Sequence, residues 1–145
     1  MIRAAVIGLG VIGKLHAELT LLNGNLVAVC DVDESCLNLY PSVKQYKDYV
    51  RMLDEVKPDV VHICTPHYLH AEMVLASLKR NVNVLCEKPL ALTREDMVAI
   101  AKASQVSTGK FMVGQICRFT PAFEKAKGQY GRVADAAKLI DPRHK

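Results

Sequence analysis

Three glycines near the start of the chain restrict its fold more than any other feature. Gly8, Gly10 and Gly13 follow the apolar run Ile2–Ile7 and precede a stretch with helical spacing. Glycines in this pattern allow a sharp turn off a strand, a close approach of another molecule to the backbone, and close packing of the next helix on the sheet. The pattern also occurs in turns that bind nothing, so it does not by itself decide between a ligand site and a structural turn.

A second strand with an acid at its end favours the ligand site. The apolar run Leu26–Cys30 delivers Asp31 about 20 residues after the glycines, as a dinucleotide-binding fold requires. The helix after the glycines would open with unpaired N–H groups and the positive end of its dipole, which suit a pyrophosphate. Asp31 can accept hydrogen bonds from a ribose diol and would repel a 2′-phosphate, so NAD is favoured over NADP. The structural alternative is an exposed aspartate at a strand end.

The rest of the chain alternates between strand-like and helix-like segments. The predicted strands are Ile2–Ile7, Leu26–Cys30, Gln45–Tyr46, Val60–Cys64, Asn83–Cys86 and Lys110–Gly114. The predicted helices are Val11–Leu22, with Leu15, Leu19 and Leu22 on one face, Glu34–Leu39, Asp48–Val56, His67–Lys79 and Thr93–Ser107. This alternation predicts an α/β fold with a doubly wound parallel sheet and right-handed crossovers.

Polar segments follow several of the predicted strands and should meet at one edge of the sheet. They are Gly8–Gly13, Asp31, Thr65–Pro66, Glu87–Lys88–Pro89 and Gln115–Arg118. In open α/β sheets, ligands bind in the crevice outside the carboxyl ends of the strands. The sequence therefore predicts a binding crevice at this edge.

Lys88 is the predicted catalytic residue. Its ammonium could stabilise negative charge that develops on a substrate oxygen during hydride transfer. A surface lysine paired with Glu87 is the structural alternative. Pro89 would stiffen the loop, and the Lys88–Pro89 bond is a candidate for a cis peptide bond.

Four possible metal ligands, His62, Cys64, His67 and His70, lie close together in sequence. Structural zinc sites use tighter paired spacings, so no metal is predicted. We expect His70, near a helix start, to pack or to hydrogen-bond beside the cofactor.

Composition excludes several function classes. The chain has 145 residues, about one domain, and a formal net charge of +4 from scattered residues. Without a basic and aromatic groove pattern, nucleic-acid binding is not expected, and no apolar run approaches the ~20 residues of a membrane span. The five cysteines, Cys30, Cys36, Cys64, Cys86 and Cys117, include no CxxC pair and read as reduced residues of a cytoplasmic protein.

With these motifs in order, the chain resembles the Gfo/Idh/MocA family of oxidoreductases. The matching pieces are Gly8–Gly13 with His16, Cys30–Asp33, Cys64–Thr65–Pro66 with His70, Cys86–Leu90, and Gly114–Gln115 with Arg118–Phe119. The resemblance implies a Rossmann fold and NAD(P)-dependent oxidation of a sugar, polyol or similar secondary alcohol.

The resemblance also implies residue roles. Lys88 matches the family lysine that contacts the reacting oxygen, and Gln115 and Arg118 match the crossover into the substrate domain. The expected cofactor-binding residues are Gly8, Leu9, Gly10, Val11, Ile12, Gly13, Asp31, Val32, Thr65, Pro66, His70, Glu87, Lys88, Gln115 and Arg118.

Two domains are expected, only one of them complete. Residues 1–120 would form the dinucleotide-binding domain, and residues 121–145 the linking helix Pro121–Lys127 and the first strand, within Gly131–Ile140, of a second α+β domain. Similar proteins are much longer, so the chain is expected to be truncated. The apolar stretch Ala136–Ile140 would then be disordered, swapped or paired with a neighbour. A homo-oligomer is expected. Two functions stay open: the nucleotide-binding part of a dehydrogenase, or a stand-alone NAD-binding module without turnover.

Overall fold

A parallel sheet organises the chain, of which the computed structural model describes residues 1–123 and 125. Its six strands lie in the order β3-β2-β1-β4-β5-β6, and every neighbouring pair is parallel. The strands are β1 Ala4–Ile7, β2 Leu26–Cys30, β3 Lys44–Tyr46, β4 Val60–Ile63, β5 Asn83–Glu87 and β6 Phe111–Gly114. The predicted parallel sheet is therefore confirmed.

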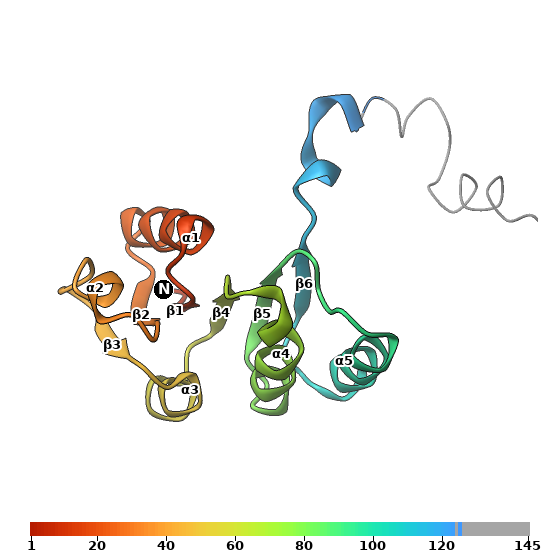
Figure 1. The fold of residues 1–145 in the computed structure, drawn as a ribbon, viewed down its shortest axis with the longest axis horizontal. Helices are drawn as coiled ribbons and strands as arrows, with labels where there is room; N and C mark the ends of the chain where they lie inside the picture. The colour runs from red at the N-terminus through yellow and green to blue at the C-terminus, as the bar shows by residue number, and fades with distance from the viewer. Residues whose placement is uncertain (124, 126–145) are drawn as a thin grey trace, which may run out of the picture. The chain divides into compact units, whose positions relative to one another are not determined.

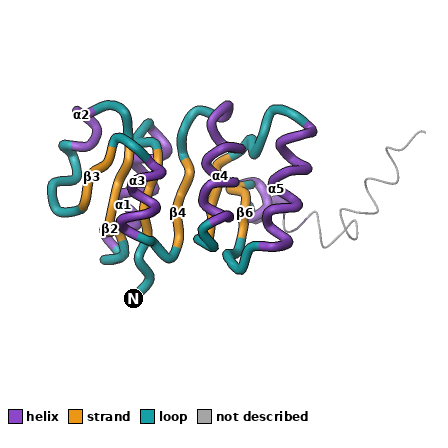
Figure 2. The backbone as a smooth tube through the Cα atoms, turned by 90° about the horizontal axis from the view of Figure 1, so that it is seen from below, coloured by secondary structure: helices purple, strands orange, loops and turns teal. Residues whose placement is uncertain are grey.

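Helices cover both faces of this sheet. They are α1 Val11–Leu22, α2 Glu34–Leu37, α3 Tyr49–Val56, α4 His70–Lys79 and α5 Arg94–Val106. The 3-10 helix η1 His67–Leu69 precedes α4, and a second 3-10 helix, η2 Ile116–Phe119, follows β6 in the chain. Figure 1 shows α1 and α2 on one side of the sheet and α3, α4 and α5 on the other, and Figure 2 shows the strands side by side. The chain winds outward from β1 to β3, then returns to β4, so β1 and β4 flank the switch point where ligands bind in such folds.

Local capping signals set several helix boundaries. The Asp48 carboxylate accepts hydrogen bonds from the backbone N–H groups of Val50 and Arg51, and starts α3 as predicted. Thr93 starts α5 by accepting from the N–H of Asp96. The predicted helix at His67 differs, because residues 67–69 form the 3-10 turn η1 and α4 begins at His70.

Two apolar clusters fill the space between the sheet and its two helix layers. Side chains alternate along β1, so Val6 joins one cluster while Ala5 and Ile7 join the other. The cluster on the α1 side includes Ala17 and Leu37. The cluster on the opposite side is larger and contains the buried apolar residues of α3, α4 and α5. This sheet core positions the strand ends that carry the site.

The packed face of α1 differs from the apolar stripe in its sequence. Gly13, Ala17 and Thr20 are buried against the sheet, whereas Leu15 and Leu19 are 50% and 52% exposed. The small residues allow the helix backbone to approach the sheet closely, and this leaves the leucine face outside. The leucines share a helical face as predicted, but within the described part of the domain about half of the Leu15 and Leu19 side chains stays exposed.

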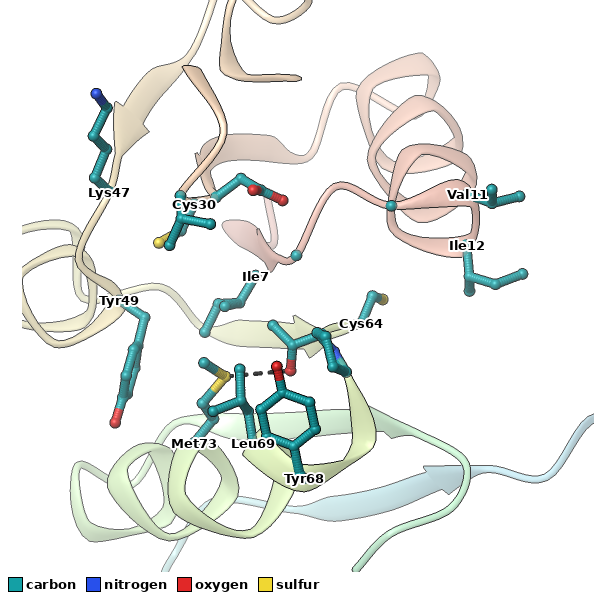
Figure 3. A pocket seen from close by; sticks show the side chains of 16 residues that line it. Ile7, Val11, Ile12, Cys30, Lys47, Tyr49, Cys64, Tyr68, Leu69 and Met73 are labelled. Carbon is teal, nitrogen blue, oxygen red and sulfur yellow. Dashed lines mark hydrogen bonds between the residues drawn. The ribbon is translucent and has the colours of Figure 1, made fainter. Parts of the chain in front are cut away.

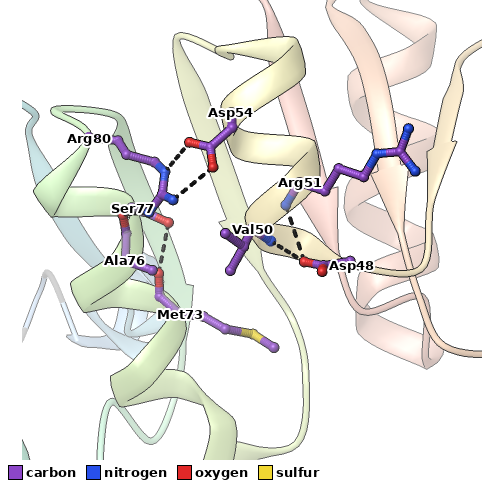
Figure 4. A network of polar contacts seen from close by, with 8 residues as sticks. All are labelled: Asp48, Val50, Arg51, Asp54, Met73, Ala76, Ser77 and Arg80. Carbon is purple, nitrogen blue, oxygen red and sulfur yellow. Dashed lines mark hydrogen bonds and ion pairs between the residues drawn. The ribbon is translucent and has the colours of Figure 1, made fainter.

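An ion pair joins α3 to the C-terminal end of α4 (Figure 4). The Arg80 guanidinium donates to both carboxylate oxygens of Asp54, at 2.7 and 3.0 Å, and to the carbonyl of Ala76. The guanidinium lowers the pKa of the Asp54 carboxyl. Because Asp54 is exposed, the pair adds little to stability.

A second unit begins after β6. Residues 1–114 form one compact unit, and a second unit begins at Gln115. Residues 121–123 of the predicted linking helix are helical. The remainder of that helix after residue 125 and the predicted strand within Gly131–Ile140 lie outside the described residues. No helix in the described part of the chain is long and apolar enough to cross a bilayer.

Candidate functional site

The glycine turn between β1 and α1 is packed tightly against the end of β4. Gly8 has a φ of +86°, and a Cβ there would lie 2.7 Å from the backbone nitrogen of Thr65. A Cβ at Gly13 would lie 1.8 Å from the carbonyl oxygen of Gly8. Gly10 differs from both, because its Cβ would meet nothing within 4 Å. Gly8 and Gly13 thus serve the turn and the helix packing, while the open side of Gly10 faces outward.

Helix α1 begins without a side chain to cap it. Its N-cap residue is Gly10, which makes no side-chain hydrogen bond. The first N–H groups of a helix have no intrahelical partner and carry the positive end of the dipole. The start of α1 is therefore suited to an anion, and Val11 and Ile12 border the cavity at this point.

Asp31 braces the glycine turn from the end of β2. Its Oδ2 accepts a hydrogen bond from the Leu9 N–H at 2.5 Å, and its Oδ1 accepts one from the Asp33 N–H at 2.9 Å. Carboxylate oxygens have further acceptor capacity, so these bonds leave room for a ribose diol. The sequence predicted only the ribose contact, and the brace is an additional role.

A cavity of about 570 Å³ lies over these elements (Figure 3). Eight predicted residues line it: Gly8, Gly10, Val11, Ile12, Asp31, Val32, Thr65 and Pro66. Leu9 and Gly13 are buried behind the turn instead. The cavity thus collects the residues that follow β1, β2 and β4, as the rule for such sheets predicts.

The opposite wall of the cavity was not predicted. It includes Tyr49 at the start of α3 and Tyr68, Leu69 and Met73 from η1 and α4. Figure 3 shows Tyr68, Leu69 and Met73 together on one side, where Met73 accepts a hydrogen bond from the Thr65 hydroxyl. Tyr49 donates to Glu72, and burial followed by this contact raises its pKa to about 12. Leu69 and Met73 come soon after the end of β4, a position that could have indicated this wall.

His70 links two loops of the site. Its ring is 1% exposed, with Nδ1 at 2.7 Å from the carbonyl oxygen of Pro89 and Nε2 at 2.9 Å from that of Thr65. His70 thus contacts the loops after β4 and β5, and its expected place beside the cofactor remains a prediction.

Lys88 is exposed at the end of β5 and is joined to Pro89 by the predicted cis peptide bond. Within the described residues, its ammonium has no carboxylate within 4.0 Å. The Glu87 carboxylate accepts from the Lys88 backbone N–H at 3.2 Å instead. The alternative of a lysine paired with Glu87 is therefore not what the structure shows.

His16 and His62 form a cluster with Glu87 that sequence reasoning missed. His16 on α1 places Nδ1 at 3.2 Å from Nδ1 of His62, and Nε2 at 3.4 Å from Oε1 of Glu87. Burial, followed by the neighbouring His16, lowers the pKa of His62 from 6.5 to about 4. His62 is therefore neutral at pH 7.

This burial predicts an acid-sensitive contribution to stability. Folded His62 binds fewer protons than unfolded His62 between pH 6.5 and 4, so the free energy of unfolding should fall as the pH drops through that range. The slope is at most about 1.4 kcal/mol per pH unit. Urea denaturation between pH 7 and 5 measures this slope, because most carboxylates titrate below that range. His62→Gln is expected to make the free energy of unfolding less dependent on pH. An unchanged slope in that variant would assign the effect to another group.

Three of the four possible metal ligands make other contacts or are buried. His62 pairs with His16, His70 contacts two carbonyls, and burial raises the pKa of Cys64 to about 12. Among the described residues, no group of three or more histidine, cysteine or acidic side chains could hold a metal ion. Gln115 is the N-cap of η2 and Arg118 lies within it, in the second unit, so their cofactor roles remain predictions.

The sheet order, the glycine turn and the acid at the end of β2 together define a dinucleotide-binding Rossmann domain. The sequence matches the oxidoreductase family described as having an NAD-binding Rossmann fold over residues 2–115. The chain therefore belongs to the Gfo/Idh/MocA family of oxidoreductases.

Individual relatives agree with this assignment. Inositol 2-dehydrogenase of Salmonella typhimurium is 32% identical over 149 residues, which cover 97% of this chain and 44% of that protein. The structure of myo-inositol 2-dehydrogenase from Lactobacillus plantarum superposes with a TM-score of 0.80 at 31% identity, over 90% of this chain and 42% of the other. Scyllo-inositol dehydrogenase from Lactobacillus casei, solved with bound NAD(H) and scyllo-inositol, gives 0.81 at 25% identity, over 97% of this chain and 43% of the other. The chain thus spans less than half the length of these relatives.

Proposed function

We propose that this domain binds NAD in the crevice at the carboxyl ends of β1, β2 and β4, as the cofactor half of a dehydrogenase. The uncapped start of α1, with the open side of Gly10 beside it, carries the proposal because it offers an anion free N–H groups and backbone access. The Asp31 carboxylate lines the same cavity and is placed to accept from an adenosine ribose. We place the apolar wall of Tyr68 and Leu69 beside the adenine.

We further propose that the complete enzyme oxidises a secondary alcohol of a sugar or polyol in the cytoplasm. Bound NAD would accept the hydride. The Lys88 ammonium, which has no ion-pair partner in the described residues, would stabilise negative charge on the substrate oxygen. Relatives that act on inositols support this substrate class. The exposed leucine face of α1 supports association with a second copy.

The charge of Asp31 predicts the choice of cofactor. NADH is expected to bind at least about ten-fold more tightly than NADPH, equivalent to about 1.4 kcal/mol, because the carboxylate repels a 2′-phosphate. Asp31→Ala should abolish this preference. Calorimetric titration of both cofactors tests the prediction.

A matched control for that test is Asp33→Asn. Asp33 is exposed and caps α2 through the Ser35 N–H, a contact that an asparagine oxygen can also make. The variant removes one nearby charge and leaves the cavity lining intact, so the NADH preference should persist. Equal affinity of the unmodified protein for the two cofactors would refute the assignment to Asp31.

A stand-alone NAD-binding module is the second candidate, because every residue that lines the cavity lies within the first compact unit, residues 1–114. Incubation of the purified chain with NAD and a panel of polyols separates the two functions. Turnover that is lost in Lys88→Ala supports catalysis by this chain, whereas NAD binding without turnover supports the module.

A further inference from the structure

The segment that carries Lys88 is held from both sides of the sheet. On the α4 side, the buried ring of His70 contacts the Pro89 carbonyl oxygen at 2.7 Å. On the α1 side, His16 contacts the Glu87 carboxylate at 3.4 Å, and that carboxylate in turn accepts from the Lys88 N–H at 3.2 Å. The residues on either side of Lys88 are thus each fixed by a histidine from a different helix.

The sheet topology places this segment at the far half of the proposed cofactor. The ADP half would lie over β1 and β2, where the glycine turn and Asp31 are. The second nucleotide must then extend across β4 toward β5, which ends at Glu87. Lys88 lies at that end, and it does not line the cavity proposed for the ADP half.

We propose that His70 and His16 are positioning residues that hold Lys88 at the nicotinamide half of the bound cofactor. The inference rests on the proposed function, since it assigns a role within the same NAD site. His70 acts through the Pro89 carbonyl and His16 through the Glu87 carboxylate. Neither histidine lines the cavity over the ADP half, so their effect should be confined to ligands that include nicotinamide.

Two isosteric replacements separate the two contacts of His70. Both of its partners are carbonyl oxygens, which only accept hydrogen bonds, so a ring nitrogen can bond its partner only where it carries a proton, and a neutral ring donates to one of the two at a time. The amide nitrogen of asparagine lies near the position of Nδ1, and that of glutamine lies near the position of Nε2. His70→Asn therefore keeps a donor for Pro89, and His70→Gln keeps a donor for Thr65.

The experiment compares NADH with ADP-ribose, which lacks the nicotinamide. Loss of one hydrogen bond corresponds to a change of about ten-fold in affinity. His70→Gln and Lys88→Ala are each expected to weaken NADH binding by about this factor, while their affinity for ADP-ribose stays within about two-fold of that of the unmodified protein. His70→Asn should keep its affinity for both ligands within about two-fold. His70→Gln should have no further effect in the Lys88→Ala background, because the two changes act on one contact. Both His70 variants should share one urea midpoint.

His16 has its own matched pair. His16→Gln keeps an amide donor for Glu87, whereas His16→Leu removes it. The leucine variant is expected to lose about ten-fold in NADH affinity, again only while Lys88 is present, and the glutamine variant to recover most of it.

Several results would overturn the proposal. They are equal losses for NADH and ADP-ribose, a His70→Gln effect that persists without Lys88, or a Lys88→Ala variant that binds NADH normally. If the unmodified protein binds both ADP-ribose and NADH but the variants give any of these three results, the positioning role fails and the NAD site stands. If the unmodified protein binds neither ligand, the proposed function itself fails and the inference falls with it.

Discussion

Gly13→Ala is expected to lower the free energy of unfolding by about 3 kcal/mol, near the top of the range for overpacked sites. The added Cβ would lie 1.8 Å from the carbonyl oxygen of Gly8 and 2.8 Å from its carbonyl carbon. Both atoms belong to the backbone, so no side-chain rotation can relieve the contact. Helix α1 must move away from the turn, which opens the cluster around Ala17. Urea denaturation measures the loss as a lower midpoint with an unchanged slope.

Gly24→Ala is the control for this prediction. Gly24 has a φ of +69°, but a Cβ there would meet nothing within 4 Å. The substitution should cost only the left-handed backbone penalty, about 1–2 kcal/mol. A Gly13→Ala protein as stable as Gly24→Ala would show that the helix packs less closely on the turn than its geometry indicates.

The elements of the sheet could be predicted from sequence because each has a local cause. The strand Leu26–Cys30 and the helix Val11–Leu22 have the predicted boundaries, and the Asp48 cap starts α3 as expected. Glycine and asparagine after Leu22, and proline after Val56, mark helix ends through backbone geometry alone. Such signals do not depend on the rest of the fold.

The packed face of α1 could not be predicted in the same way. An apolar stripe with helical spacing looks the same whether it covers its own sheet or faces outward. The residues that pack, Gly13 and Ala17, are small and carry a weak hydrophobic signal. Close approach of backbones therefore decided the orientation, and only coordinates show it.

The candidate site also combines residues that local sequence signals predict with contacts that only the packed fold creates. Residues placed by the strand-end rule, such as Asp31 and Thr65, do line the cavity. The contacts of His16 with His62 and Glu87 join three separate elements, and no local spacing indicates them. The Asp31 brace was missed because a strand-end acid can serve the turn and a ligand together.

Gly10→Val is expected to abolish NADH binding without harming the fold. Gly10 has φ −66° and ψ −166°, a conformation that any residue adopts, and its Cβ direction is free of neighbours within 4 Å. The added side chain would occupy the space through which a pyrophosphate reaches the N–H groups of α1. We expect affinity to fall at least about 100-fold, equivalent to about 2.7 kcal/mol.

The control for Gly10→Val is Gly10→Ala, whose single methyl group should cause a smaller loss of NADH affinity. Both variants should unfold at the same urea concentration as the unmodified protein, so the pair separates binding from stability at one position. Normal NADH affinity in Gly10→Val would mean that the pyrophosphate does not approach here, and the proposed cofactor site would have to be abandoned. A drop in both affinity and stability would instead make Gly10 part of the packed turn, like Gly8 and Gly13.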